Sequence, residues 1–354
     1  MSQGKTSAPI LVTGATGYIA SWVIKNLLEQ GYTVHATVRD LNKKQSFAHL
    51  EKIAQANTGT LKLFKANLLE NGSFDEAMQD CEIVIHMASP FVVTNFKDAV
   101  NDIIKPAILG TENVLNSVNK TETVNRVIVT SSIASTYGDA IDILDTTNNQ
   151  FDESHWNMTS STTHQPYPYS KVMAERKAWD MAKAQNRWNL VCINPALVLG
   201  PSLTATTQSG SVEVLEQFAN GMTLLGVPPM WNGIVDVRDV ADAHIHAALN
   251  PKASGRYIIS GGSFSLLEMG KILLKYFGQK FPFPRNQVPK KAFKLIGPAF
   301  GYSRDFIEKN MGYPIYFNAD KSKQELGITY RNINTSLVEH FQQLLDDGVV
   351  KKYI

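Results

Sequence analysis

Tyr167 and Lys171 stand four residues apart in a stretch of helical character, so their side chains are expected to share one helix face. A tyrosine is a poor acid near neutral pH, because its unperturbed pKa is about 10. A neighbouring ammonium favours the phenolate and so suits the hydroxyl to proton transfer. Tyr169 is nearby, but it lacks the four-residue spacing to Lys171. Ser132, which ends an apolar run, adds a hydroxyl that can donate a hydrogen bond to a substrate oxygen.

The elements that must position these side chains alternate between short apolar runs and longer helical patterns. Seven strands are predicted, at residues 10–13, 34–38, 61–65, 83–87, 127–130, 190–194 and 257–259. Because these runs are apolar throughout, we expect a parallel sheet with helices on both faces. The predicted fold class is therefore α/β, a doubly wound (Rossmann) sheet with a smaller C-terminal substrate-binding lobe. Such sheets bind ligands at the carboxyl ends of their strands.

A glycine motif joins the first predicted strand to the first predicted helix, at residues 18–30. Gly14 permits a tight turn there, and Gly17 lets the backbone approach a pyrophosphate at the helix N-terminus. Ala20 allows close packing of the helix on the strand. A glycine motif alone is weak evidence, but this one has a strand before it and a helix after it. The pattern predicts a dinucleotide site.

Arg39 ends the second predicted strand, where enzymes that use NAD place an acidic residue on the ribose 2′-hydroxyl. Its planar guanidinium suits a 2′-phosphate, since it can make paired hydrogen bonds. Lys43 or Lys44 is expected to assist. Asp40 follows directly and leaves an acidic residue close to this position. We predict NADPH as the cofactor.

Domain bounds follow from this organisation. Residues 1–200 are expected to form the NADP-binding domain and residues 201–354 mainly the substrate lobe, with residues 234–262 rejoining the sheet. Pro168 disfavours a helical backbone at Tyr167, so we expect a helix at residues 168–185 that begins just after the tyrosine. Further helices are predicted at residues 43–56 and 98–118, and residues 226–233, rich in glycine and proline, are expected to be irregular.

Composition excludes several other classes of protein. The 354 residues carry a formal net charge of +2, which does not suggest binding to nucleic acid or to a membrane surface. No signal region or apolar run of about 20 residues is present, so a cytoplasmic location is expected. Cys81 and Cys192 lie in apolar surroundings and are expected to be buried thiols. No metal-ligand spacing occurs, so no metal site is expected. The expected binding partner is a small carbonyl compound as substrate, and the protein is expected to be a monomer or a homodimer.

The order of several motifs resembles the extended short-chain dehydrogenase/reductase family. The motifs are TGATGYIA, VRD, HMASPF, VTSS, YPYSK and NPALVLGP. They are most similar to a branch that holds plant dihydroflavonol reductases, cinnamoyl-CoA reductases and yeast methylglyoxal/isovaleraldehyde reductases. The match covers roughly residues 9 to 260 and weakens afterwards. The resemblance implies a carbonyl reductase in which Tyr167, Lys171 and Ser132 are catalytic.

The resemblance also implies which residues contact the cofactor and the substrate. Cofactor contacts are expected from Gly14, Thr16, Gly17, Tyr18, Ile19, Arg39, Lys43, Asn67, Leu68, Ala88, Ser89, Tyr167, Lys171, Pro195 and Val198. Phe91 and Tyr137 are expected to line the substrate pocket. Asn67 departs from the usual Asp but can still accept a hydrogen bond. Tyr137 replaces the Asn of the plant dihydroflavonol enzymes, and the cinnamoyl-CoA signature NWYCYGK is absent, so both plant substrates are disfavoured.

Two alternatives remain open beside NADPH-dependent reduction of a ketone or aldehyde. One is an NAD-dependent nucleotide-sugar epimerase or dehydratase of the same extended family, against which Arg39 and the HMASPF segment argue. The other is a non-catalytic, NADP-sensing protein. The sensor is disfavoured because such proteins usually lose the Tyr/Lys pair.

Overall fold

The computed structural model describes residues 7–90, 97–204 and 210–351. Its main sheet has seven parallel strands in the order β3-β2-β1-β4-β5-β6-β9. Their bounds are β1 Ile10–Thr13, β2 Thr33–Val38, β3 Thr60–Lys65, β4 Ile83–His86, β5 Arg126–Thr130, β6 Asn189–Pro195 and β9 Gly255–Ile259. The strand order reverses between β1 and β4, which is the switch point where doubly wound sheets bind ligands. The predicted fold class is confirmed.

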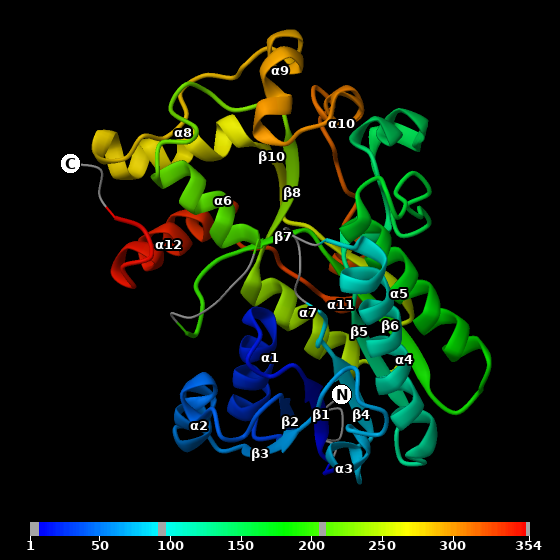
Figure 1. Cartoon of the computed structure of the whole chain (residues 1–354). Helices are drawn as coiled ribbons and strands as arrows, with labels where there is room; N and C mark the ends of the chain where they lie inside the picture. Colours follow the sequence, from blue (N-terminus) through cyan, green and yellow to red (C-terminus); the bar gives the residue numbers. More distant parts are fainter. Residues whose placement is uncertain (1–6, 91–96, 205–209, 352–354) are drawn as a thin grey trace.

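Helices cover both faces of this sheet (Figure 1). α1 packs against α2 and α7 on one face, whereas α4 packs against α3 and α5 on the other. Their bounds are α1 Tyr18–Glu29, α2 Ala48–Gln55, α3 Asp75–Met78, α4 Lys105–Lys120, α5 Pro166–Lys183 and α7 Val237–Leu249. α5 follows β5 by way of a long excursion that starts with the 3-10 helix η3, Ile133–Ser135.

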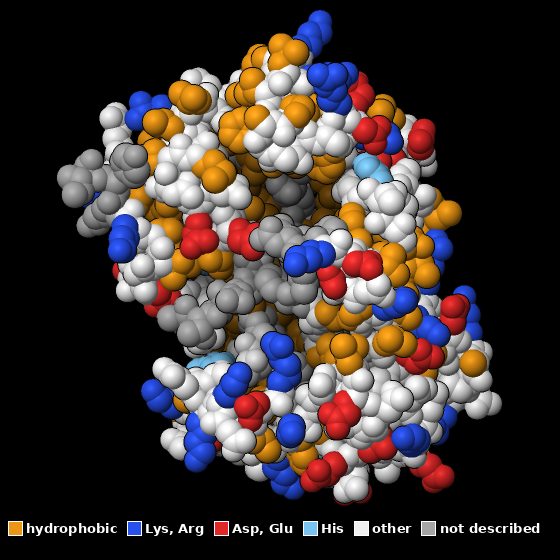
Figure 2. Space-filling view, viewed as in Figure 1, with side chains coloured by type: hydrophobic (Ala, Val, Ile, Leu, Met, Phe, Trp, Pro, Cys, Tyr) orange, Lys and Arg blue, Asp and Glu red, His pale blue; other side chains and the backbone are white. Residues whose placement is uncertain are grey.

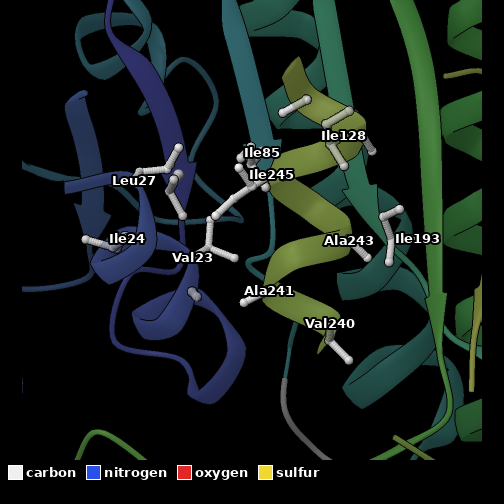
Figure 3. Close-up of a cluster of buried hydrophobic side chains, with 14 of the residues drawn as sticks. Val23, Ile24, Leu27, Ile85, Ile128, Ile193, Val240, Ala241, Ala243 and Ile245 are labelled. Carbon is white, nitrogen blue, oxygen red and sulfur yellow. The ribbon is translucent and has the colours of Figure 1, made fainter. Parts of the chain in front are cut away.

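The core lies in two layers, because successive strand residues point to opposite faces. Ile85, Ile128 and Ile193 face α1 and α7, where Val23, Ile24, Leu27 and Ile245 pack against them (Figure 3). Val84, Val127 and Cys192 face the other layer, which also buries Trp188 and Cys81. Both cysteines are free and buried, as predicted.

A second, three-stranded sheet is formed by β7 Leu197–Leu199, β8 Trp231–Asp236 and β10 Gly262–Ser265, in the order β10-β8-β7. Helices α6 Gly210–Ala219, α8 Leu266–Phe277 and α12 Ile333–Asp346 pack around it over Phe218, Phe283 and Phe341. α9 Lys290–Ile296 and α10 Arg304–Asn310 form a separate small cluster, and α11 Asp320–Leu326 packs against β9. None of the helices in the described parts of the chain is both long enough and apolar enough to cross a membrane.

The start of α5 differs from the prediction. The helix begins at Pro166 and takes Tyr167 into its first turn, rather than starting after it. The backbone N–H groups of a first helical turn have no acceptor within the helix, so prolines at 166 and 168 remove no hydrogen bond there. The left-handed backbone of Gln165 (φ 52°, ψ 60°) directs the chain into the helix.

Three other elements also differ. Residues 43–56 form the 3-10 helix η1 (Lys44–Ser46) followed by α2, not one helix. Residues 100–120 form the π-turn η2 (Val100–Ile104) and then α4, because Pro106 lacks the N–H that a continuous α-helical ladder requires. The expected irregular segment 226–233 ends in strand β8, which pairs on both edges with β7 and β10. Those ladders outweigh the weak strand propensity of Gly233.

Candidate functional site

The glycine loop is locked to the loop that follows β4. Gly14 has φ +69°, and a Cβ there would lie 2.9 Å from the Cα of Ala88. The backbone N–H groups of Met87 and Ala88 both donate to Thr13 Oγ1 at 3.0 Å. Gly14 N donates to Thr37 Oγ1 at 3.2 Å, which ties the loop to β2 as well. The loop is thus a rigid backbone cradle of the kind that a pyrophosphate requires.

The same threonine fixes the state of His86, which ends β4. Thr13 Oγ1 already accepts two N–H groups, so its single proton donates to His86 Nδ1 at 2.9 Å. The imidazole therefore carries its own proton on Nε2. Burial, with a smaller contribution from the charge of Lys171, lowers the pKa of His86 to about 4. A neutral imidazole is consequently built into the carboxyl edge of the sheet.

Arg39 lies in the turn that follows β2, close in sequence to Lys43, and both side chains are exposed. The Asp40 carboxylate makes a local contact, because its Oδ1 accepts the backbone N–H of Asn42 at 2.9 Å. The turn therefore offers two cations, while its one carboxylate is engaged locally. This donor set fits a 2′-phosphate better than a 2′-hydroxyl.

The Tyr/Lys pair lies on the first turns of α5, as its spacing predicted. Lys171 Nζ is 5.4 Å from the ring centroid of Tyr167. The same ammonium donates to Ser89 Oγ at 2.9 Å, on the loop after β4. Lys171 therefore bridges the tyrosine and a segment predicted to line the cofactor.

Ser132 follows β5, on a turn that packs against α5. Its Oγ accepts the backbone N–H of Ala134 at 3.1 Å, which leaves the hydroxyl proton available for another acceptor. Ser131 is buried instead and donates to Glu175 at 2.5 Å. Within the described ranges, Ser132 and Tyr167 are not hydrogen-bonded to each other.

A pocket opens where β4 and β5 end. It brings together four predicted residues, Leu68, Ala88, Ser89 and Lys171, but is not lined by Tyr167 or Ser132. The rest of its wall is His86, Pro90, Ala107, Gly110, Thr111, Val129, Thr130, Ser131, Ala174 and Glu175. Gly110 lets α4 pack closely on Leu68, because a Cβ there would lie 3.2 Å from a Leu68 methyl group.

Several other predicted cofactor residues lie around this edge. The Tyr18 hydroxyl donates to the carbonyl of Gly200, and burial raises the pKa of Tyr18 well above its usual value. Asn67 Oδ1 accepts the N–H of Leu69 at 3.2 Å, so this side chain is used within its own turn. Thr16 and Gly17 are exposed on the glycine loop, Ile19 packs against the main core, Pro195 ends β6 and Val198 lies in β7.

The two predicted substrate residues have different outcomes. Phe91 lies outside the residues that the structure describes. Tyr137 belongs to an aromatic cluster, stacked on Phe151 at 4.9 Å and tilted against Phe317 at 5.6 Å. Burial raises the pKa of Tyr137 to about 12, so its hydroxyl stays neutral.

Sequence reasoning missed a buried polar network beneath the site. The Glu175 carboxylate, with a fully buried side chain, accepts Arg256 Nε at 2.6 Å. Ser135 Oγ and Asn194 Nδ2 lie 2.5 and 2.9 Å from the same carboxylate. Asn194 also donates to the carbonyl of Ser132 at 3.2 Å. The only sequence signal was the position of Glu175, four residues after Lys171 on the same helix face.

Comparison with known proteins places this site in a family. The model of the NAD dependent epimerase/dehydratase family matches residues 10–260. Dihydroflavonol 4-reductase from Gerbera hybrida is 36% identical over 308 residues, covering 83% of this chain and 82% of the relative. Cinnamoyl-CoA reductase CAD2 from Medicago truncatula is 35% identical over 347 residues, covering 97% and 98%. The chain therefore belongs to the NAD dependent epimerase/dehydratase family, as the resemblance to extended short-chain reductases predicted.

Solved structures agree with this assignment. The crystal structure of Gre2 from Candida albicans in complex with NADPH superposes with a TM-score of 0.76. That protein is 27% identical to this chain, and the match covers 96% of this chain and 99% of the other.

Proposed function

We propose that the chain is an NADPH-dependent reductase that converts a ketone or aldehyde into an alcohol. The observation that carries the proposal is the position of Lys171, which lies against the Tyr167 ring and donates to Ser89 across the edge of the sheet. The similarity to plant reductases and to an NADPH-bound protein supports it. Tyr167 and Lys171 suit proton transfer, and the rigid glycine loop suits binding of a dinucleotide beside them.

The dinucleotide would be held along the carboxyl edge of the sheet. Gly14 and Gly17 would admit the pyrophosphate, and Arg39 with Lys43 would bind the 2′-phosphate. Lys171 and Ser89 would hold the ribose next to the nicotinamide. When bound, the reduced nicotinamide supplies the hydride.

The chain's own residues then handle the substrate oxygen. Tyr167 donates its phenolic proton to that oxygen as the alcohol forms. The Lys171 ammonium stabilises the phenolate that remains. Ser132 donates a hydrogen bond to the same oxygen, a role open to it because its hydroxyl proton is not used by Ala134.

The substrate would lie between the two lobes. Figure 2 shows the surface hollowed between the part that carries α9 and the part that carries α4 and α5, with hydrophobic side chains on its walls. Tyr137, with Phe151 and Phe317 behind it, would form an aromatic wall of this space. Phe91 is proposed to contribute to the same wall. Such a lining favours carbonyl compounds with an apolar or aromatic body.

The test is consumption of NADPH, followed by absorbance, against a panel of aldehydes, diketones, keto esters and dihydroflavonols. Tyr167→Phe should lower kcat about 10²- to 10⁴-fold, the usual contribution of a positioned acid, and leave the Kd for NADPH within about twofold. Tyr169→Phe is the matched control, since Tyr169 shares the helix turn but lacks the spacing to Lys171. It should keep wild-type kcat.

Three results would contradict the proposal. Full activity of Tyr167→Phe would remove the tyrosine from the reaction. NADPH binding without turnover on any carbonyl compound would favour a sensing protein, and tightly retained NAD would favour an epimerase or dehydratase.

A further inference from the structure

We propose that Asp139 is a positioning residue for Tyr167, and that it ties the start of α5 to α10 of the C-terminal lobe. The inference rests on the proposed role of Tyr167. Asp139 lies seven residues after Ser132. Among the described residues, the side chains that donate to its carboxylate are His164, Gln165 and Asn310, none of which is a predicted catalytic residue.

The Asp139 carboxylate is buried, with 1% of the residue exposed, and three side chains donate to it. Gln165 Nε2 donates to Oδ1 at 2.7 Å, and Asn310 Nδ2 donates to the same oxygen at 2.6 Å. His164 Nε2 lies 2.8 and 2.9 Å from the two oxygens. Two of these donors come from the residues that lead into α5, and the third comes from the end of α10.

Gln165 needs such an anchor because its backbone is left-handed, with φ 52° and ψ 60°. A residue with a Cβ enters that region only where its surroundings enforce it. Its side-chain amide has two protons, and one donates to Asp139 while the other reaches the carbonyl of Gly138 at 2.7 Å. The Asp139 loop therefore enforces the turn.

That turn sets the direction of the first turn of α5. The carbonyl of Gln165 accepts the first helical hydrogen bond, from the N–H of Tyr169 at 3.1 Å. Pro166 and Pro168 have no N–H, and no side chain caps the helix. Tyr167 lies in this first turn, whose N–H groups have no acceptor within the helix, so its position depends on the direction that Gln165 gives the chain as well as on the bond that its own carbonyl accepts from Ser170 Oγ at 2.7 Å.

Asn310 extends the connection to the C-terminal lobe. Its Nδ2 donates to Asp139, and its Oδ1 accepts the N–H of Ala140 at 3.0 Å. The amide therefore ties α10 both to the Asp139 carboxylate and to the backbone of the next residue. Movement of α10 relative to the sheet would pull on the segment that holds Tyr167.

Loss of the carboxylate leaves three donors without this acceptor, and the Gln165 side chain keeps only its bond to the Gly138 carbonyl. A misplacement of about 1 Å at a reacting group can cost about 10²-fold in rate. We expect Asp139→Ala to lower kcat about 10- to 100-fold, while the Kd for NADPH stays within about twofold, since the glycine loop and Arg39 are remote in sequence from this cluster. Asp139→Asn keeps an acceptor oxygen for Gln165 and should stay within about threefold of wild type.

The decisive experiment is a double-mutant cycle on kcat with Asp139→Ala and Gln165→Ala. If the aspartate acts through the glutamine, Gln165→Ala lowers kcat about 10-fold alone and adds little in the Asp139→Ala background. Gln165→Ala also keeps the test decisive if Asp139→Ala does not fold. Asp142→Ala is the matched control: it removes an acceptor of the Gly138 and Asp139 N–H groups, at 3.3 and 3.0 Å, without touching residues 164 and 165. It should lower Tm, and because Gln165 keeps both of its acceptors it should lower kcat by less than about threefold, well short of the effect of Asp139→Ala.

The inference is overturned if Asp139→Ala or Gln165→Ala keeps wild-type kcat, if the two substitutions act additively, or if Asp142→Ala lowers kcat as much as Asp139→Ala. These outcomes differ from failure of the proposed function, which Tyr167→Phe reports by itself. An inactive Tyr167→Phe together with a fully active Asp139→Ala would refute only the positioning role.

Discussion

Replacement of Arg256 by methionine should destabilise the fold by several kcal/mol. Arg256 Nε donates to Glu175 Oε1 at 2.6 Å, and the Glu175 side chain is fully buried. A methionine keeps an unbranched stem near Trp156, on whose ring the guanidinium lies at 4.1 Å. The substitution therefore removes the positive charge and leaves a buried carboxylate without its counter-ion.

Breaking a buried ion pair in this way typically costs about 3–5 kcal/mol. Four groups would still contact the carboxylate, namely Ser131 and Ser135 at 2.5 Å, Asn194 at 2.9 Å and Trp179 Nε1 at 3.3 Å. These contacts place the expected loss at the lower end, at about 3 kcal/mol of the free energy of unfolding. That is a large part of the roughly 5–15 kcal/mol that stabilises a typical protein.

Urea unfolding followed by fluorescence measures the loss as a shift in midpoint at constant slope. Adding Glu175→Gln to Arg256→Met should restore part of the stability, because the unpaired charge is then gone. Lys323→Met is the control: it breaks an exposed pair with Asp320 and should cost less than about 0.5 kcal/mol. A loss of under about 1 kcal/mol for Arg256→Met, or no recovery in the double variant, would refute the reasoning.

Two further predictions concern acid and the cofactor. Burial lowers the pKa of His86, His244 and His340 to about 4, whereas the unfolded chain titrates near 6.5, so stability is full above about pH 6.5 and is lost as the pH falls toward 4. Each histidine should lower the free energy of unfolding by about 2 kcal/mol between pH 7 and pH 5. Urea unfolding of His340→Gln should show a free energy of unfolding that depends less steeply on pH than that of the wild type, and an unchanged slope would contradict this prediction. Arg39→Ala should raise the KM for NADPH about 10-fold or more with the KM for NADH unchanged, in steady-state assays with both cofactors; an equal rise for both would remove Arg39 from the 2′-phosphate site.

The parts of the fold that could be predicted are those that local chemistry decides. The strands are continuous apolar runs, and only glycine fits at position 14, where φ is +69° and Ala88 leaves no room for a Cβ. The four-residue spacing of Tyr167 and Lys171 is likewise a local property of a helix. These features lie within a few residues of one another, so the sequence displays them directly.

The start of α5 could not be predicted in the same way, because two local rules conflict there. A proline disfavours a helical residue before it, yet prolines are well tolerated in a first turn. Contacts from distant residues resolve the conflict: Gln165 is held by Asp139, whose carboxylate also accepts from Asn310, 171 residues further along the chain. The sequence around position 167 therefore gives no sign that Asp139 and Asn310 are its structural partners.

The same limit explains why the polar network under the site was missed, and it shows how α5 is oriented. Tyr167, Lys171 and Glu175 follow at intervals of four, so they form one stripe along a helix of 3.6 residues per turn. Lys171 reaches the loop after β4 through Ser89, whereas Glu175 reaches β9 through Arg256, 81 residues away. The rotation of the helix about its axis is therefore fixed by the buried ion pair.

Rotation alone does not place the phenol, because Tyr167 lies in the first turn of α5, where the backbone N–H groups have no acceptor within the helix. The ion pair at Glu175 lies two turns further along the helix. A second constraint at the upper end is needed, and Gln165, held by the Asp139 loop, supplies it. Loss of the lower constraint should thus reduce stability first, whereas loss of the upper constraint should reduce kcat first, and the Arg256→Met and Asp139→Ala variants separate the two.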